Sequence, residues 1–131
     1  MPSVLIEVRK EYSQEEEIGI MNAVHAALVA AFKIPPGDKI IRLVVHAPHK
    51  FNVPPAKLKP EYYTLVSIDA ISGRSIEAKR KLYAGIVKNL EPFGIPNDHV
   101  MILLRESIAE NWGIKGGKPA SDVHLDFDVN V

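Results

Sequence analysis

The residue with the most distinctive chemistry is Pro2, which follows Met1 directly and precedes the strand-like run VLIEV. If Met1 is removed, Pro2 carries a free secondary amine at the end of a strand. Burial in an apolar pocket near cations lowers the pKa of an amine, and the neutral amine is then a general base for a proton beside a carbonyl. An unshifted amine stays a cation and can act as a general acid. The simpler alternative is a proline that only fills the first position of a strand.

Two further residues, Arg74 and Asp38, are candidates for the chemistry, and Arg74 suits a carboxylate substrate. Arg74 lies in SGRS at the predicted first turn of a helix, and a guanidinium binds a carboxylate through two hydrogen bonds. Backbone N–H groups at a helix N-terminus add to such an anion site. Asp38 ends the turn IPPGD, as Asp98 ends the related turn IPND. Aspartate is common in turns, so a structural role for Asp38 stays open beside a chemical one.

Three more side chains are candidates for substrate binding, namely Arg42, Arg105 and Trp112. Arg42 lies within a predicted strand and faces either a pocket or a partner subunit. Trp112 lies in a Gly-rich loop, where an aromatic ring walls a pocket or packs at a subunit boundary. His25 is interpreted as a satisfied core or interface histidine. The histidines do not fall at metal-ligand spacing with carboxylates, so we expect no metal and no cofactor.

The elements that must position these residues form two repeats of strand, helix and strand. Runs rich in β-branched residues predict strands at 3–9, 39–46, 63–71 and 99–106. Ser13 with Glu16 is a capping box for the first helix, and Ser75 caps the second. Apolar residues at helical spacing support both helices: Ile18, Met21, His25, Leu28 and Phe32, then Leu82, Tyr83, Ile86 and Leu90. YSQEE matches RSIEA, and FKIPPGD matches FGIPND, about sixty residues further on.

This order of elements predicts an α/β (α+β) fold. A crossover helix makes the two strands that it joins parallel, so two units give a four-stranded sheet with both helices on one face. The runs IIRLVV and VMILL hardly alternate, which is typical of strands covered on both sides. No further helix is available, so a neighbouring subunit is expected to cover the second face.

The chain is expected to form one domain, 1–131, with repeat one at 2–47, repeat two at 62–106 and a C-terminal arm at 107–131. The arm contains a Gly-rich turn and then the alternating run VHLDFDV. We interpret this run as a strand suited to pairing with the sheet edge of another chain.

Composition limits the classes of function. The 131 residues suffice for a domain with a real core. Sixteen basic residues balance sixteen acidic ones, so no overall field favours nucleic acid or an anionic membrane. The absence of cysteine excludes disulfides and thiolate chemistry. The first residues of the sequence do not have the pattern of a signal peptide, and no stretch of apolar residues approaches the ~20 that span a membrane. We therefore expect a cytoplasmic protein.

Several stretches, in their order along the chain, carry a resemblance to a known family: Pro2, AVHAALVAAFKIPPGD, VHAP at 45–48, GRSIEAKRKLY at 73–83 and ENWGIKGG at 110–117. Together they resemble the tautomerase superfamily, in particular the branch of malonate semialdehyde decarboxylase and cis-chloroacrylate dehalogenase. The resemblance implies a homotrimer of β-α-β-β-α-β subunits, with active sites near subunit boundaries and a catalytic N-terminal proline.

The resemblance also implies roles for particular residues. In the decarboxylase, an aspartate at the place of Asp38 helps to activate water beside the proline. Two arginines separated by one residue are expected near Arg74, and Ser72 stands where the first would be. Arg105 is then a candidate to replace part of the missing charge.

The favoured function is a cofactor-independent tautomerase acting on a small 2-oxo or enol carboxylate. Pro2 moves the proton, Arg74 holds the carboxylate, and Asp38 orients water or substrate. The first alternative is a lyase, through hydration-dependent decarboxylation of a 3-oxo acid or dehalogenation of a haloacrylate. The second is a trimeric binding protein without catalysis.

Overall fold

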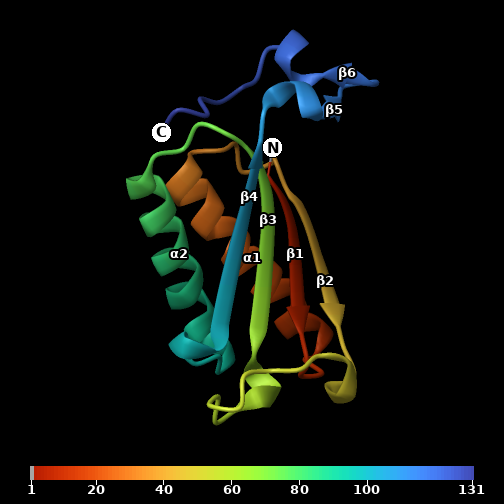
Figure 1. The fold of residues 1–131 in the computed structure, drawn as a ribbon, viewed down its shortest axis with the longest axis vertical. Coiled ribbons are helices and arrows are strands. Elements are labelled where there is room, and N and C mark those ends of the chain that lie inside the picture. Colours follow the sequence, from red (N-terminus) through yellow and green to blue (C-terminus); the bar gives the residue numbers. More distant parts are fainter. Residues whose placement is uncertain (1) are drawn as a thin grey trace.

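Four strands form one mixed sheet in the order β2-β1-β3-β4 (Figure 1). The computed structural model describes residues 2–131. The strands of this sheet are β1 (Ser3–Val8), β2 (Ile40–Val45), β3 (Thr64–Ile71) and β4 (Val100–Ser107). The pairs β1–β2 and β3–β4 are parallel, and β1–β3 is antiparallel. The expected pair of β-α-β units and the parallel pairing within each are therefore confirmed.

Two helices, α1 (Gln14–Phe32) and α2 (Ile76–Leu90), cover one face of this sheet (Figure 1). The Ser13 side chain accepts from the Glu16 N–H at 3.1 Å, and the Glu16 carboxylate accepts from the Ser13 N–H. This is the predicted capping box. The Ser75 hydroxyl likewise accepts from the Ala78 N–H, as predicted. The helix starts were therefore readable from local sequence, because the capping side chain lies within three residues of the N–H that it satisfies.

The core lies between the helices and the sheet. The α1 residues that it buries include Ile20, Val24 and Phe32. Ile18, which the predicted stripe placed inside, is 48% exposed. The buried face of α1 is therefore rotated from the predicted stripe, whereas Leu82, Ile86 and Leu90 of α2 are buried as expected.

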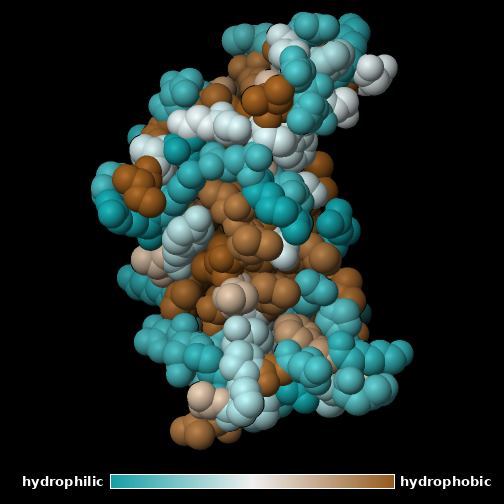
Figure 2. All heavy atoms as spheres, in the orientation of Figure 1, coloured by the Kyte–Doolittle hydropathy of each residue, from teal (hydrophilic) through white to brown (hydrophobic). Residues whose placement is uncertain are grey.

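Among residues 2–131, no helix lies over the opposite face of the sheet. Its apolar side chains alternate with the core-facing ones and remain exposed: Ile40, Val44, Met101 and Leu103. Figure 2 shows hydrophobic side chains gathered along the middle of the molecule, over the strands. We call this side of the sheet, which does not face the helices, the open face; its most exposed apolar residues are the four just named.

The remaining elements are short. A two-stranded hairpin joins β5 (Gly113–Ile114) to β6 (Lys118–Pro119). Single 3-10 turns occupy Pro48–Lys50, Pro60–Tyr62, Glu91–Phe93, Asn97–His99, Ala109–Asn111 and Ala120–Asp122. Among residues 2–131, no helix has the length and apolar character needed to cross a membrane.

The predicted strand at 123–129 does not form in the single chain, and residues 123–131 have no regular secondary structure. This segment, which we call the tail, runs back over its own chain to the start of α2 (Figure 1). The Ser75 N–H donates to the Val131 carbonyl oxygen at 2.8 Å. Gly73 has φ +139°, and a Cβ there would lie 2.8 Å from the Val129 carbonyl oxygen, so the tail approaches the backbone where only glycine fits.

Candidate functional site

One end of the sheet gathers the chain segments that carry the strongest candidates. Pro2, the turn between α1 and β2, the start of α2 and the tail all lie there (Figure 1). Pro2 is buried and comes one residue before β1. Ser3 pairs with Ile40 on one side and with Asp69 on the other. The topology therefore brings Pro2 to the strand end where Asp38 precedes β2 and Arg74 follows β3.

Arg74 is the most unusual side chain at this end, because its guanidinium is buried with donors to spare. It is 6% exposed. Nη1 donates to the Ile71 carbonyl oxygen at 2.8 Å. Nε and Nη2 are buried and have no hydrogen-bond partner within the described residues 2–131. Since a buried donor is normally paired, two unpaired donors on one guanidinium mark a place where a carboxylate can bind through both of its oxygens.

Aromatic rings and carboxylates surround the guanidinium. Its Cζ lies 4.7 Å from the ring centre of Phe32 and 5.6 Å from that of Phe127. Burial lowers the pKa of Arg74 from its ordinary value, and the charges of Glu106, Asp38 and Asp128 act in the opposite direction. Lys79 partly balances Glu106, since its Nζ lies 2.6 Å from Oε1 of that residue.

Asp38 is held by a turn that is tied to helix α1. Its backbone N–H donates to the Pro35 carbonyl oxygen at 3.0 Å. The buried His25 ring places Nε2 2.7 Å from the Pro36 carbonyl oxygen, so Nε2–H donates to it. The expectation of a satisfied structural histidine at 25 is thus confirmed, and this hydrogen bond fixes the turn that presents Asp38.

A cleft of about 290 Å³ opens between this turn and the tail. Its walls are Pro35, Gly37, Asp38, Lys115, His124, Leu125, Asp126 and Phe127. Asp38 and Phe127 therefore face a space large enough for a small organic acid. Arg74 does not line this cleft, but its guanidinium Cζ lies 5.6 Å from the ring centre of Phe127, which does.

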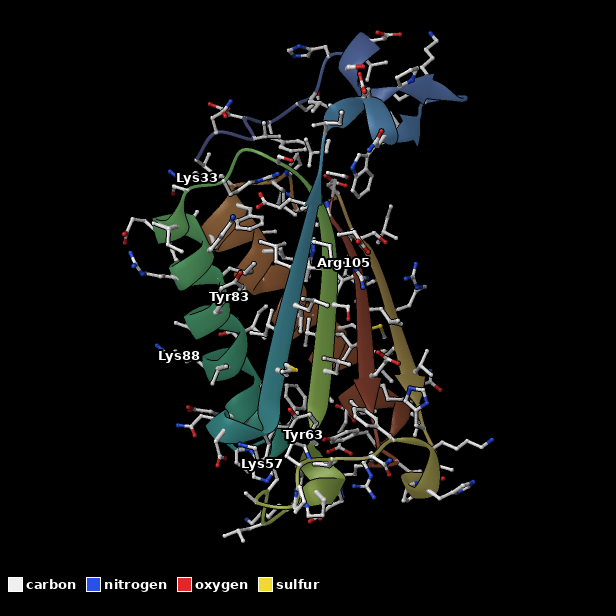
Figure 3. All side chains as sticks on the ribbon, viewed as in Figure 1. Lys33, Lys57, Tyr63, Tyr83, Lys88 and Arg105 are labelled. Atoms are coloured by element: carbon white, nitrogen blue, oxygen red, sulfur yellow. The ribbon has the colours of Figure 1, made fainter. Side chains whose placement is uncertain are left out.

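The other predicted substrate-binding residues lie apart from this group. Arg42 is exposed on the edge strand β2, on the open face. Arg105 lies toward the site end of β4 (Figure 3), but its guanidinium forms two hydrogen bonds to Asp69, at 2.9 and 3.1 Å. Trp112 donates from Nε1 to the Ser107 hydroxyl at 2.9 Å. The structure therefore brings Pro2, Asp38 and Arg74 to one end of the sheet. The other candidates lie apart from them: Arg42 and Arg105 on the open face, and Trp112 in the loop after β4.

The segment VHAP lies at the far end of the sheet. The His46 N–H donates to the Val8 carbonyl oxygen at the C-terminal end of β1, and its ring binds Glu7 at 2.9 Å. Tyr63 and Lys57 lie at this same end (Figure 3). Within residues 2–131, no three His, Asp or Glu side chains are grouped so that they could hold a metal ion.

Sequence reasoning missed the two rings on Arg74. Phe32 was assigned only to the core stripe of the first helix, and Phe127 to a strand of the arm. Nothing local in the sequence predicts either contact, since the partners come from three distant segments.

The comparisons with known proteins identify the family and the fold. A sequence model described as "Tautomerase enzyme" matches residues 38–115, which is more than half of the chain. The chain therefore belongs to this tautomerase family, as the resemblance had implied. The match begins at Asp38 and includes Arg74, Arg105 and Trp112.

Solved structures share the fold over nearly the whole chain. FG41 malonate semialdehyde decarboxylase, inhibited by 3-bromopropiolate, is 26% identical with a TM-score of 0.83, covering 94% of this chain and 98% of that one. A second malonate semialdehyde decarboxylase, described with decarboxylase and hydratase activities, is 21% identical with a TM-score of 0.81, covering 93% and 99%. A wild-type fused 4-OT symmetric trimer is 20% identical with a TM-score of 0.78, covering 90% and 95%. The mixed four-stranded sheet with two helices is thus the fold of these enzymes.

Proposed function

We propose that the protein is a cofactor-independent tautomerase that moves a proton between carbon and oxygen of a small 2-oxo or enol carboxylate. The observation that carries this proposal is the buried Arg74 guanidinium, whose Nε and Nη2 lack partners at the sheet end that also holds Pro2 and Asp38. After removal of Met1, the neutral Pro2 amine takes the proton. Arg74 binds the substrate carboxylate, and Asp38 orients substrate or water from the wall of the cleft.

The charge around Arg74 favours tautomerisation over loss of carbon dioxide. Asp38, Glu106 and Asp128 all act on Arg74, so the guanidinium stands among negative charges. Enolisation needs a neutral base and one oriented carboxylate. Decarboxylation needs a protonated Pro2, water activated by Asp38 and denser positive charge around the leaving group.

Decarboxylation is the second candidate, because the FG41 malonate semialdehyde decarboxylase is 26% identical over 94% of the chain. The two reactions are separated by comparing kcat/KM for ketonisation of phenylenolpyruvate with kcat/KM for decarboxylation of malonate semialdehyde. We expect ketonisation to be the faster reaction, with kcat/KM rising with pH as the Pro2 amine loses its proton.

The same comparison with Asp38→Asn identifies the reaction that depends on activated water. Asp98→Asn is the matched control, because Asp98 is the corresponding turn residue at the opposite end of the sheet, where it binds His99. Two results together would make the lyase the better assignment. Decarboxylation would be faster than ketonisation in the wild type, and Asp38→Asn would abolish decarboxylation while ketonisation persists.

We further propose that the protein is a homotrimer whose subunits cover one another's open faces. Support comes from the exposed apolar residues of that face and from the fused 4-OT structure, which is a symmetric trimer. Burying a large apolar side chain contributes about 1.5–3 kcal/mol, so the four most exposed apolar residues of each subunit's open face supply much of the association free energy.

Leu103→Glu is expected to dissociate this assembly, because it places a charge on the open face, where Leu103 is 47% exposed. Sedimentation velocity should then show a mass near 14.5 kDa in place of three times that value. Leu58→Glu is the control, since Leu58 lies in a loop at 91% exposure. A wild-type protein that sediments as a folded monomer would contradict the trimer.

A further inference from the structure

The tail lies against Arg74, the residue proposed to bind a carboxylate: the ring centre of Phe127 is 5.6 Å from the guanidinium Cζ. Nε and Nη2 are both buried and both unpaired. The cleft beside Asp38 is lined by Phe127 but not by Arg74. Phe127 therefore lies at both the cleft and the guanidinium, whereas Arg74 does not line the cleft.

The other contacts of Arg74 do not depend on the tail. Phe32 belongs to α1, is fully buried, and lies nearer to the guanidinium than Phe127 does, at 4.7 Å against 5.6 Å. Nη1 is bound to the Ile71 carbonyl oxygen. One ring and one hydrogen bond from the rigid core thus hold the orientation of the guanidinium, while the second ring comes from a segment without secondary structure.

The attachment of the tail suits movement. Residues 123–131 form neither helix nor strand. Besides the packing of Phe127 and Val131 against the core, the tail is joined to the rest of the described chain by three hydrogen bonds. These run from the Ser75 N–H to the Val131 oxygen at 2.8 Å, from Lys115 Nζ to the His124 oxygen at 3.4 Å, and from the Val123 N–H to the Ala120 oxygen at 3.4 Å. Segments with few such bonds open at low cost in free energy.

The tail also carries a charge that competes with a carboxylate. Asp128 lies next to Phe127 in sequence and acts on Arg74 from the tail. Its Oδ1 accepts from the Asn130 N–H at 2.8 Å, which keeps the carboxylate within the tail's own turn. When the tail moves, Phe127 uncovers the two donors, and the negative charge of Asp128 leaves together with the ring.

We infer that Phe127 and Asp128 form a mobile cover that controls access of a substrate carboxylate to Arg74. The inference rests on the proposed function in that Arg74 is the carboxylate site. The closed cover leaves two guanidinium donors unpaired, which is unfavourable in a buried place. A bound carboxylate accepts hydrogen bonds from both donors, so it stabilises the open arrangement. An uncharged ligand would stabilise that arrangement less. Since the apparent Kd equals the intrinsic Kd divided by the open fraction, weakening the cover tightens carboxylate binding.

The test uses the full chain with Phe127→Ala and Asp128→Asn, and with Val123→Ala as a control elsewhere in the tail. The first readout is solvent exchange of the Arg74 Nε–H, followed by NMR on ¹⁵N-labelled protein. The second is the Kd for pyruvate, a small carboxylate with no ring to occupy the place of Phe127, with methyl pyruvate as the uncharged analogue. Neither readout requires turnover, so both remain valid if Pro2 proves not to be a base.

We expect Phe127→Ala to speed exchange of the Arg74 Nε–H by on the order of tenfold and to lower the Kd for pyruvate severalfold. Asp128→Asn should lower that Kd in the same direction, and methyl pyruvate should respond to neither variant. Val123→Ala should behave like the wild type. Unchanged exchange in Phe127→Ala would overturn the inference. So would weaker pyruvate binding in that variant, because Phe127 would then orient Arg74 rather than cover it.

Discussion

Pro2→Ala should lower kcat/KM for ketonisation of phenylenolpyruvate by at least about 10²-fold, the scale on which a positioned general base contributes. Pro2 is buried at the start of β1, and its ring fixes the direction of the amine, whereas an alanine amine rotates freely. In the proposed mechanism the base is the neutral prolyl amine, the form that exists above the pKa of its ammonium. The wild-type kcat/KM should therefore be lost as the pH falls through that pKa, because protonation removes the base.

Two measurements make this result specific to Pro2. Intact-mass spectrometry should show loss of Met1 from the wild type, since the amine exists only after that cleavage. Ser3→Ala is the control, because it alters the adjacent residue, leaves Pro2 in place and should keep wild-type activity. A protein that retains Met1 and is still fully active would remove Pro2 from the mechanism.

The second large effect is expected for Arg74→Ala on an acid substrate. A hydrogen bond to a charged group contributes roughly 1.5–3 kcal/mol, so kcat/KM for a carboxylate should fall by roughly 10- to 150-fold, mainly through KM. The ester of the same substrate should be much less affected. Arg74→Lys should restore only part of the activity, because an ammonium keeps the charge without the planar pair of donors.

The stability of the variant distinguishes binding from folding. Arg74→Ala loses the Nη1 hydrogen bond to Ile71 and the contact with Phe32. However, Nε and Nη2 have no partners to lose among residues 2–131, and burial of the cation is itself unfavourable. Thermal unfolding of Arg74→Ala should therefore change little compared with the loss of activity. Arg80→Ala, which removes an exposed arginine paired with Glu77 on the same helix, is the control. Equal losses on acid and ester would assign Arg74 a structural role instead.

Much of the fold could be read from local sequence. The capping side chains of Ser13 and Ser75 act within three residues, so their partners were visible in the sequence itself. The four main strands lie within one or two residues of their predicted ends. The crossover rule then fixed the parallel pairing within each unit, because a strand, helix and strand of these lengths can return to the sheet only in that sense.

The gathering of Pro2, Asp38 and Arg74 also followed from order along the chain. In two β-α-β units paired through antiparallel β1 and β3, the start of β1, the start of β2 and the end of β3 meet at one edge. Residue types with suitable chemistry stood at those three places in the sequence. Their position at one end of the sheet thus follows from the order of elements only once the antiparallel pairing of β1 and β3 is known, and that pairing comes from the structure.

Only the tertiary structure decided which candidates face which way. Side chains alternate between the two faces of a strand, so a shift of one residue decides whether an arginine faces the core or the open face. Arg42 and Arg105 proved to lie on the open face, and Arg105 is paired with Asp69. An apolar run such as IIRLVV contains no signal that separates the two faces.

The conformation of the tail was the feature least predictable from the sequence. The alternation of VHLDFDV fits a strand, but a strand forms only where an unpaired edge is within reach, and alternation does not report whether one exists. In the single chain, Phe127 instead packs on Arg74, and Ser75 binds Val131. The contacts that bury Arg74 join α1, the start of α2 and the tail. Local sequence cannot specify such contacts, because they arise only when the packed core has brought distant segments together.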